Sequence, residues 1–215
     1  MAAATVRLLA IGTALTGAHA LRVRREIRSL SEAQRVAVFA ALTTMKTTPQ
    51  DAGEALYGPD FLNYERFVVK HAHAAMHPRC DQGHYGPAFV TYHRAFTLLM
   101  ENALLAVDPS IEGLPYWDYN IDLAEYADPR DSIVWTEAFF GENEGDATDG
   151  WMIRDGPFAA WEVATNASAL APDLLLSPSG FLRGPTNVQF APRLTRSSSI
   201  CGVRTPTTFS LANWR

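Results

Sequence analysis

The sequence lacks the long basic tracts with which proteins bind nucleic acid. Its 18 Lys and Arg residues are outnumbered by 23 Asp and Glu residues, which gives a formal net charge of -5. Such a balance leaves no electrostatic footprint for nucleic acid. No stretch approaches the roughly 20 apolar residues that a membrane span requires, and no internal repeat or low-complexity block occurs. With 215 residues, 47% of them hydrophobic, the sequence predicts one soluble globular domain with a core of its own.

The apolar run nearest the N-terminus is too short to cross a bilayer. Arg7 precedes this run, which covers residues 8–15, and small residues ending in Ala18-His19-Ala20 follow it. A basic residue, a short apolar stretch and an A-x-A site are typical of a secretory signal peptide. We therefore expect residues 1–20 to be a signal peptide and the protein to be secreted or to lie in the lumen of the secretory pathway. A buried helix at the start of the domain is the alternative.

Cysteine is scarce, so a disulfide framework is excluded beyond a single bond. Cys80 and Cys201 are the two cysteines, and they could pair in an oxidising compartment. Geometry decides whether that bond forms, and the sequence leaves it open. Asn166 opens an Asn-Ala-Ser glycosylation acceptor, which fits the secretory route, although such triplets also arise by chance.

Apolar residues recur at spacings of three and four in three segments, which we expect to be helices: residues 31–48, about 61 to at most 78, and 91 or 93 to 108. The first begins with Ser31 and has Gln34 three residues on, the pattern of a capping box. Pro78 sets the last position at which the second can continue. Glycine and proline become frequent beyond residue 118, so the chain from 172 to 215 is expected to be rich in loops.

Histidine is absent after residue 93, and this absence is as informative as the histidines that precede it. One of the six, His19, lies in the expected signal peptide. The other five lie within residues 71–93, at His71, His73, His77, His84 and His93. Clustered imidazoles are what a zinc, copper, iron or nickel site needs. The alternative is that none of them binds a metal.

Three of these histidines can converge on one point. His71 lies near the end of the second expected helix, on the same face as Phe67, and His93 lies near the start of the third. Two helices packed by those faces would bring both imidazoles together. His84 lies on the intervening loop, within reach of both. The sequence thus predicts a three-nitrogen site with one open side.

His73 and His77 form a rival pair, because residues spaced i, i+4 on a helix face the same way and could chelate a metal. Pro78 disfavours helix at His77, so the simpler interpretation is that both are solvent-exposed or accessory histidines. No H-E-x-x-H motif is present, and metal-dependent hydrolysis therefore has little support.

The segment from His84 to Arg94, HYGPAFVTYHR, resembles the first copper-binding motif of tyrosinases, catechol oxidases and molluscan haemocyanins, the type-3 copper proteins. In that motif two histidines flank eight residues, and an arginine follows the second. The resemblance extends to residues 64–71, 99–108 and 114–118 in order and spacing, and covers roughly residues 22–120.

This resemblance implies a mainly α fold, part of an antiparallel four-helix-bundle type-3 copper domain with a long loop-rich C-terminal segment, over residues 21–215. It implies copper as the cofactor, with dioxygen and a phenolic small molecule as partners. The family reaction is the oxidation of phenols and o-diphenols to o-quinones. The resemblance leaves the substrate and the oligomeric state open.

The resemblance also assigns roles to individual residues. The family pattern gives His71, His84 and His93 to one copper, which settles their rivalry with the other pair. Phe89 is expected to form an aromatic wall beside the site. Polar scaffold residues, expected to pair with one another, are Arg94, Glu101 and Asp118.

Three departures from the family pattern stand out. Thr91-Tyr92 replaces the usual Pro-Trp, and Cys80 lies four residues before His84 rather than the two that a thioether link to that histidine would require. Most important, the second copper needs three further histidines, and none follows His93. We expect the chain to end before the second copper half, as a truncated product or a fragment, to bind one copper, and to have little or no phenol oxidase activity. A non-catalytic mononuclear copper protein and a haemocyanin-like oxygen carrier are the alternatives.

Overall fold

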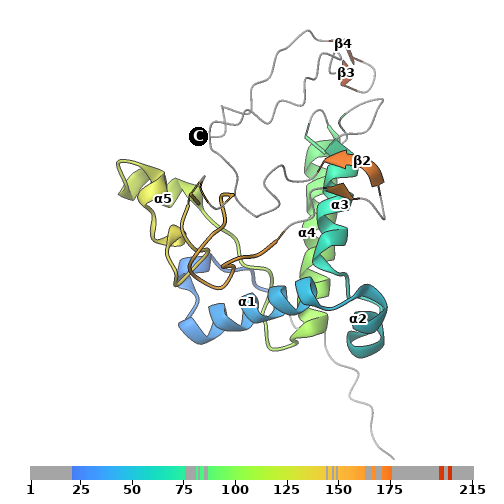
Figure 1. The fold of residues 1–215 in the computed structure, drawn as a ribbon, viewed down its shortest axis with the longest axis horizontal. Helices are drawn as coiled ribbons and strands as arrows, with labels where there is room; N and C mark the ends of the chain where they lie inside the picture. The colour runs from blue at the N-terminus through green and yellow to red at the C-terminus, as the bar shows by residue number, and fades with distance from the viewer. Residues whose placement is uncertain are drawn as a thin grey trace, which may run out of the picture.

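A computed structural model describes residues 21–75, 81, 83–84, 87–143, 145–146, 148 and 150–162, together with four short backbone strands further on. This part of the chain is mainly helical, which confirms the predicted fold class (Figure 1). In chain order, its helices are η1 (Ile27–Ser29), α1 (Glu32–Thr47), α2 (Gln50–Tyr57), α3 (Tyr64–Ala75), α4 (Ala88–Val107), α5 (Tyr119–Glu125), η2 (Pro129–Asp131) and η3 (Ile133–Trp135).

Strands β3 and β4 and most of β2 lie in the segment that was expected to be rich in loops, and β1 lies before it. They form two antiparallel pairs, β1 (Asn166–Ala167) with β2 (Ala171–Leu175) and β3 (Ser199–Ile200) with β4 (Val203–Arg204). Several predictions fall outside the described residues: the signal peptide, His77, both cysteines and most of the tail. Among the described residues, no helix is both long enough and apolar enough to span a membrane.

Helix α1 begins where the sequence predicts. The Ser31 hydroxyl accepts a hydrogen bond from the Gln34 N–H at 3.3 Å, and the Gln34 side chain accepts one from the Ser31 N–H at 3.0 Å. This reciprocal capping box satisfies two backbone donors that the first turn would otherwise leave unpaired. Phe39 and Met45 of α1 are both buried in the core.

Helices α3 and α4 run antiparallel and side by side (Figure 1). The Phe67 and Phe96 rings meet edge to face at 5.7 Å, and His71 lies opposite His93 one turn further along α3. As the residue number rises on α3 it falls on α4, so the order of these contacts defines the antiparallel register. Helix α1 packs against both helices and completes a three-helix core.

Helix α4 begins earlier than predicted, at Ala88 rather than at residues 91–93. Pro87 already has helical dihedrals, with φ -68° and ψ -18°. Proline is tolerated there because the first N–H groups of a helix have no partner within the helix. The early start places His93 in the second turn of α4, where regular helix geometry fixes its direction.

Two short helices, α2 and α5, have too few residues to give a clear periodic signal and were not predicted. Helix α2 packs on the ring of Phe61, which is 1% exposed. Gly53 makes this approach possible, because a Cβ at this position would lie 2.0 Å from the ring edge. Asp118 caps the N-terminus of α5, where its carboxylate accepts a hydrogen bond from the Asn120 N–H.

The chain beyond α5 has little periodicity but contributes several aromatic side chains to the core. Phe158 and Phe140 both contact the ring of Phe39 on α1, at centroid distances of 5.2 and 5.6 Å. Trp161 lies 4.9 Å from Phe158. Aromatic contacts of this kind add to the free energy gained from burying the rings. This segment therefore covers the side of α1 that α3 and α4 leave open.

Candidate metal centre

Three imidazoles from two helices and a turn meet at one end of the α3–α4 pair. His71 comes from the last two turns of α3, His84 from the turn that follows, and His93 from the second turn of α4. Their ring centroids are 4.9 Å apart for His71–His84 and 5.7 Å apart for both other pairs. One potential ligand atom from each lies within 4.8 Å of the other two. The structure thus brings together the three histidines that the sequence placed in one site.

The contacts between α3 and α4 set this convergence. The Phe67–Phe96 pair lies one turn from the histidines and fixes the spacing of the two helices. The Tyr92 hydroxyl donates to the Lys70 carbonyl of α3 at 3.2 Å, which links the helices next to His71. Burial raises the pKa of the Tyr92 hydroxyl, and the nearby Asp81 adds to this, so the hydroxyl remains a donor.

The hydrogen bonds of two of the rings determine which nitrogen faces the site. Nδ1 of His93 lies 3.0 Å from the carbonyl oxygen of Phe89, and Nδ1 of His84 lies 3.0 Å from the Asp81 carboxylate. Carbonyl and carboxylate oxygens can only accept, so both Nδ1 atoms carry the proton. Each ring then keeps its lone pair on Nε2, which is the arrangement metal-binding histidines adopt.

Burial lowers the pKa of His71, and the neighbouring imidazoles of His84 and His93 lower it further. His71 is therefore held in the neutral form, which is the form that binds metals. Nitrogens bound to one ion at about 2.0 Å lie at most about 4 Å apart, so small side-chain rotations close this set around an ion. Imidazole nitrogens suit copper as well as zinc, iron or nickel.

The centre opens toward the surface beside an aromatic ring. His84 is exposed, and the Phe89 ring lies 4.5 Å from His93 and is 38% exposed. Phe89 therefore lies beside His93, and its role as an aromatic wall of the site stays a prediction. His73 lies on α3 with an exposed side chain and is not part of this cluster.

The prediction that Arg94, Glu101 and Asp118 pair with one another is wrong. Glu101 is buried, and its carboxylate accepts from Arg24 Nε at 2.7 Å and from the Leu114 N–H at 2.9 Å. The Asp118 carboxylate caps α5 instead. Arg94 is exposed and makes no ion pair with another described residue. Residues of the N-terminal segment, rather than Arg94 or Asp118, contact the buried carboxylate of Glu101. Local sequence carries no signal for a contact between residues so far apart in the chain.

The N-terminal segment is joined to the chain after α4 by further long-range contacts. The Ile27 N–H donates to the Tyr116 carbonyl at 2.8 Å, and the Tyr116 N–H donates to the Arg25 carbonyl at 2.9 Å. Arg28 pairs with the fully buried Asp122. The same carboxylate accepts from the Ser132 hydroxyl at 2.7 Å, so this buried charge is well compensated. Sequence reasoning missed Asp122 because its partners are scattered along the chain.

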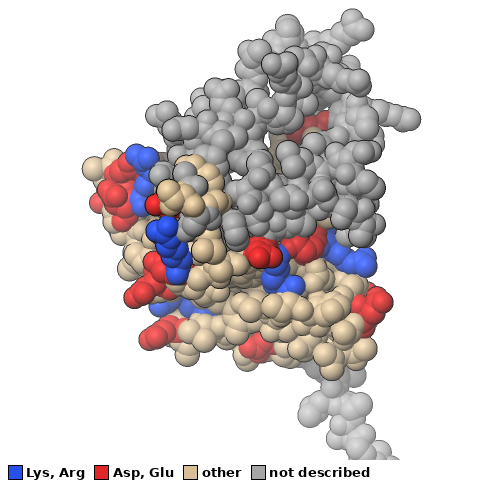
Figure 2. Space-filling model, in the orientation of Figure 1, with Lys and Arg blue, Asp and Glu red and all other residues tan. Residues whose placement is uncertain are grey.

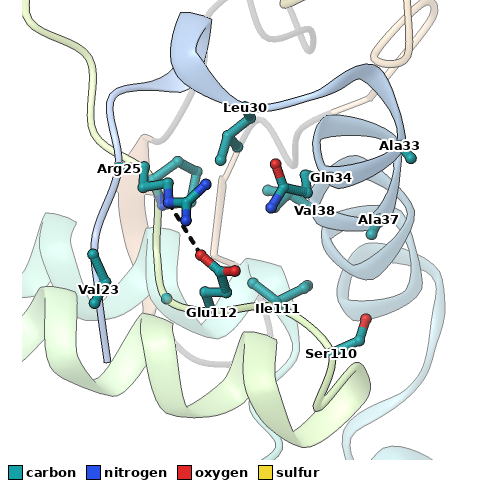
Figure 3. A pocket seen from close by; sticks show the side chains of 12 residues that line it. Val23, Arg25, Leu30, Ala33, Gln34, Ala37, Val38, Ser110, Ile111 and Glu112 are labelled. Atoms are coloured by element: carbon teal, nitrogen blue, oxygen red, sulfur yellow. Dashed lines mark ion pairs between the residues drawn. The ribbon is translucent and has the colours of Figure 1, made fainter. Parts of the chain in front are cut away.

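A separate pocket lies at the other end of α4, between the N-terminal segment, α1 and the loop that follows α4 (Figure 3). Leu30, Val38 and Ile111 contribute apolar lining, and Arg25 pairs with Glu112 across it at 3.1 Å. Val107 and His93 are about 20 Å apart along the helix axis, and no histidine lines the pocket. On the visible face of the described chain, acidic and basic side chains are interspersed (Figure 2).

Comparison with known proteins places the chain in a family. Residues 62–208 match the model of the common central domain of tyrosinase. The chain is 34% identical over 148 residues to a putative tyrosinase-like protein, tyr-3, of Caenorhabditis elegans, and 33% identical over 144 residues to the tyrosinase of Streptomyces antibioticus. These matches cover 69% and 65% of this chain. The chain belongs to the tyrosinase family, whose proteins use copper.

A solved structure agrees with this assignment. The polyphenol oxidase (mutant G292N) of Thermothelomyces thermophila superimposes with a TM-score of 0.50 at 25% identity, over 75% of this chain. The chain spans 18%, 45% and 46% of the nematode, bacterial and fungal proteins respectively. It therefore corresponds to less than half of each of these relatives.

Proposed function

We propose that residues 21–215 form a copper-binding domain of the tyrosinase type, in which His71, His84 and His93 hold one copper ion. The convergence of three imidazoles, two of them with Nε2 left free as the ligand atom, supports this proposal most directly. The family match favours copper among the metals that this donor set could hold. Because three side chains of the described residues form this cluster, an ion held by them would keep a coordination position for a further ligand.

Bound copper supplies the redox chemistry of the family reaction, the dioxygen-dependent oxidation of phenols and o-diphenols to o-quinones. The protein contributes the fixed imidazoles and an aromatic surface. Phe89 lies beside His93 and is partly exposed, so its ring can flank a phenolic ring that approaches the open side. We propose binding and orientation of the phenol as the role of Phe89.

The histidine content of these 215 residues supports one copper ion rather than two. No histidine follows His93, so the chain supplies three imidazoles to a family site that holds two metal ions. The given 215 residues by themselves would therefore hold one copper ion. We expect the 215-residue chain alone to oxidise phenols slowly or not at all.

Copper loading of the purified 215-residue chain tests both statements. We expect about one copper per chain by elemental analysis after dialysis, and no oxidation of an o-diphenol above the rate given by the same amount of free copper. Two tightly bound coppers per chain would contradict the stoichiometry. Rapid, saturable quinone formation with one copper bound would contradict the expected lack of turnover and leave the site intact.

We also propose that the protein enters the secretory pathway, with residues 1–20 as its signal peptide and Asn166 as a glycosylation site. The composition of the N-terminal 20 residues and the Asn-Ala-Ser triplet support this. Mass spectrometry of the product from a secreting host is the test. We expect a polypeptide that starts at Leu21, and an uncleaved intracellular product would contradict the proposal.

A further inference from the structure

Both carboxylate oxygens of Asp81 make contacts at the metal centre. Oδ1 accepts hydrogen bonds from the Gly83 N–H at 2.9 Å and from the His84 N–H at 2.8 Å. Oδ2 lies 3.0 Å from Nδ1 of the His84 ring. One oxygen therefore shapes the turn, and the other holds the imidazole that the turn carries.

We propose that Asp81 is a positioning residue that fixes the tautomer and direction of His84, so that Nε2 of this ring faces His71 and His93. This inference rests on the proposed function, since it assigns to Asp81 the orientation of one of the three copper ligands. It makes Asp81 part of the metal centre although it does not touch the ion.

The need for such an anchor follows from where each ligand lies. His71 and His93 are on regular helices, and the Phe89 carbonyl four residues earlier holds Nδ1 of His93. His84 lies in a turn, where no helical carbonyl can do this. The turn lies close to both helices, because Gly83 is buried and a Cβ at this position would lie 3.6 Å from the Ala74 side chain and 3.7 Å from the Tyr92 ring.

The carboxylate also affects how strongly the ring binds a metal. A carboxylate that accepts from Nδ1–H raises the electron density on Nε2, and outer partners of this kind typically contribute about ten- to a hundredfold in metal affinity. The Asp81 side chain is 18% exposed, against 36% for the His84 side chain. Its hydrogen bond is therefore better shielded from water than the ring it supports.

Asp81→Asn is a sharp test because the asparagine can keep the turn but not the histidine contact. Its amide oxygen must accept from the Gly83 and His84 N–H groups, so the amide cannot flip. The NH2 group then faces Nδ1 of His84, and it can only donate. We expect the ring to move its proton to Nε2, the nitrogen that should bind copper.

Two measurements on the full chain detect this change in the tautomer of His84 and its effect on copper binding. Nitrogen-15 NMR of the metal-free protein at mildly alkaline pH, where imidazole rings are neutral, should show the Nδ1–H tautomer of His84 in the wild type and the Nε2–H tautomer in Asp81→Asn. Copper titration against a competing chelator should show an affinity about ten- to a hundredfold lower in the variant. Circular dichroism of the metal-free variant should match the wild type.

Asp146→Asn is the matched control, because the Asp146 carboxylate shapes a similar turn through the Thr148 N–H at 2.8 Å and contacts no histidine in the described structure. It should leave the tautomer and the copper affinity unchanged. An unchanged His84 tautomer in Asp81→Asn, or a copper affinity within about twofold of wild type, overturns the inference. A wild-type chain that binds no copper overturns the proposed function instead, and the NMR result still decides the hydrogen bond.

Discussion

Three imidazoles can share one ion only if each directs a lone pair to the same point, and each ring here is oriented by its own surroundings. A helical carbonyl holds His93, a carboxylate holds His84, and burial among its neighbours keeps His71 neutral. The spacing of the three histidines and the family motif predicted that these three would be the ligands, and the structure brings them together. They did not predict the contacts of Asp81. The sequence pattern Asp-x-Gly-His does not show that both carboxylate oxygens contact the turn and the His84 ring, because this depends on how the turn folds.

At the same scale, Glu101 is a buried charge whose partners lie outside its own helix. Burial opposes its ionisation, but the hydrogen bonds from Arg24 and the Leu114 N–H outweigh that effect and lower its pKa below the ordinary value of 4.5. A carboxyl group whose pKa is lower in the folded state stabilises the fold above its ordinary pKa. That stabilisation is lost as the pH falls through the folded value.

We therefore expect Glu101→Gln to lower the free energy of unfolding by about 2 kcal/mol at neutral pH, because charged hydrogen bonds to Arg24 and Arg22 become neutral ones. The deficit should shrink as the pH falls below 4.5, where the wild-type carboxyl group also loses its charge. Urea unfolding curves of both proteins at neutral and acid pH measure this. If the difference in free energy of unfolding between the two proteins stays constant down to a pH of about 2, the lost stability comes from the changed shape of the side chain rather than from the loss of its charge.

At the scale of the elements, sequence signals worked where they were local. The capping box of Ser31 and Gln34 marks the start of α1, and the described α3 lies within the limit that Pro78 sets in the sequence. Helices α2 and α5 were missed because seven or eight residues give too little periodicity to separate from a loop. Their positions depend on tertiary contacts, such as the Phe61 ring beneath Gly53.

This contact makes Gly53 a second test site. Alanine usually stabilises a helix relative to glycine, but here its Cβ would lie 2.0 Å from the Phe61 ring. We expect Gly53→Ala to lower the free energy of unfolding by about 1–3 kcal/mol through overpacking. In a Phe61→Leu background, which removes the ring edge, the added cost should fall to near zero. A stabilising Gly53→Ala in the wild-type background would show that α2 shifts freely on the core.

At the scale of the whole molecule, the sequence and the family motif predicted a mainly helical domain, and the structure confirms it. They did not predict how the chain beyond residue 126 folds back over α1, because Phe140, Phe158 and Trp161 follow no period. The predicted pairing of Arg94, Glu101 and Asp118 failed for a related reason. The real partners of Glu101 come from the other end of the described chain.

The arrangement of the molecule separates its two concave features. The histidines lie at the α4 end nearest α3's last turn, and the apolar pocket lies at the opposite end of α4. The core of α1, α3 and α4 lies between them. Substitutions around Arg25 and Glu112 are thus far enough from the histidines for their effects to be additive with changes at the metal centre.

Copper binding by two histidine variants of the same chain tests the central claim most directly. His93→Ala removes a proposed ligand on α4. His73→Ala removes an exposed histidine of α3 that is not part of the cluster, and it serves as the matched control. We predict that wild type and His73→Ala bind one copper with equal affinity, and that His93→Ala loses at least about tenfold in affinity. Unchanged binding in His93→Ala, or loss of binding in His73→Ala, would contradict the assignment of His71, His84 and His93 as the copper ligands.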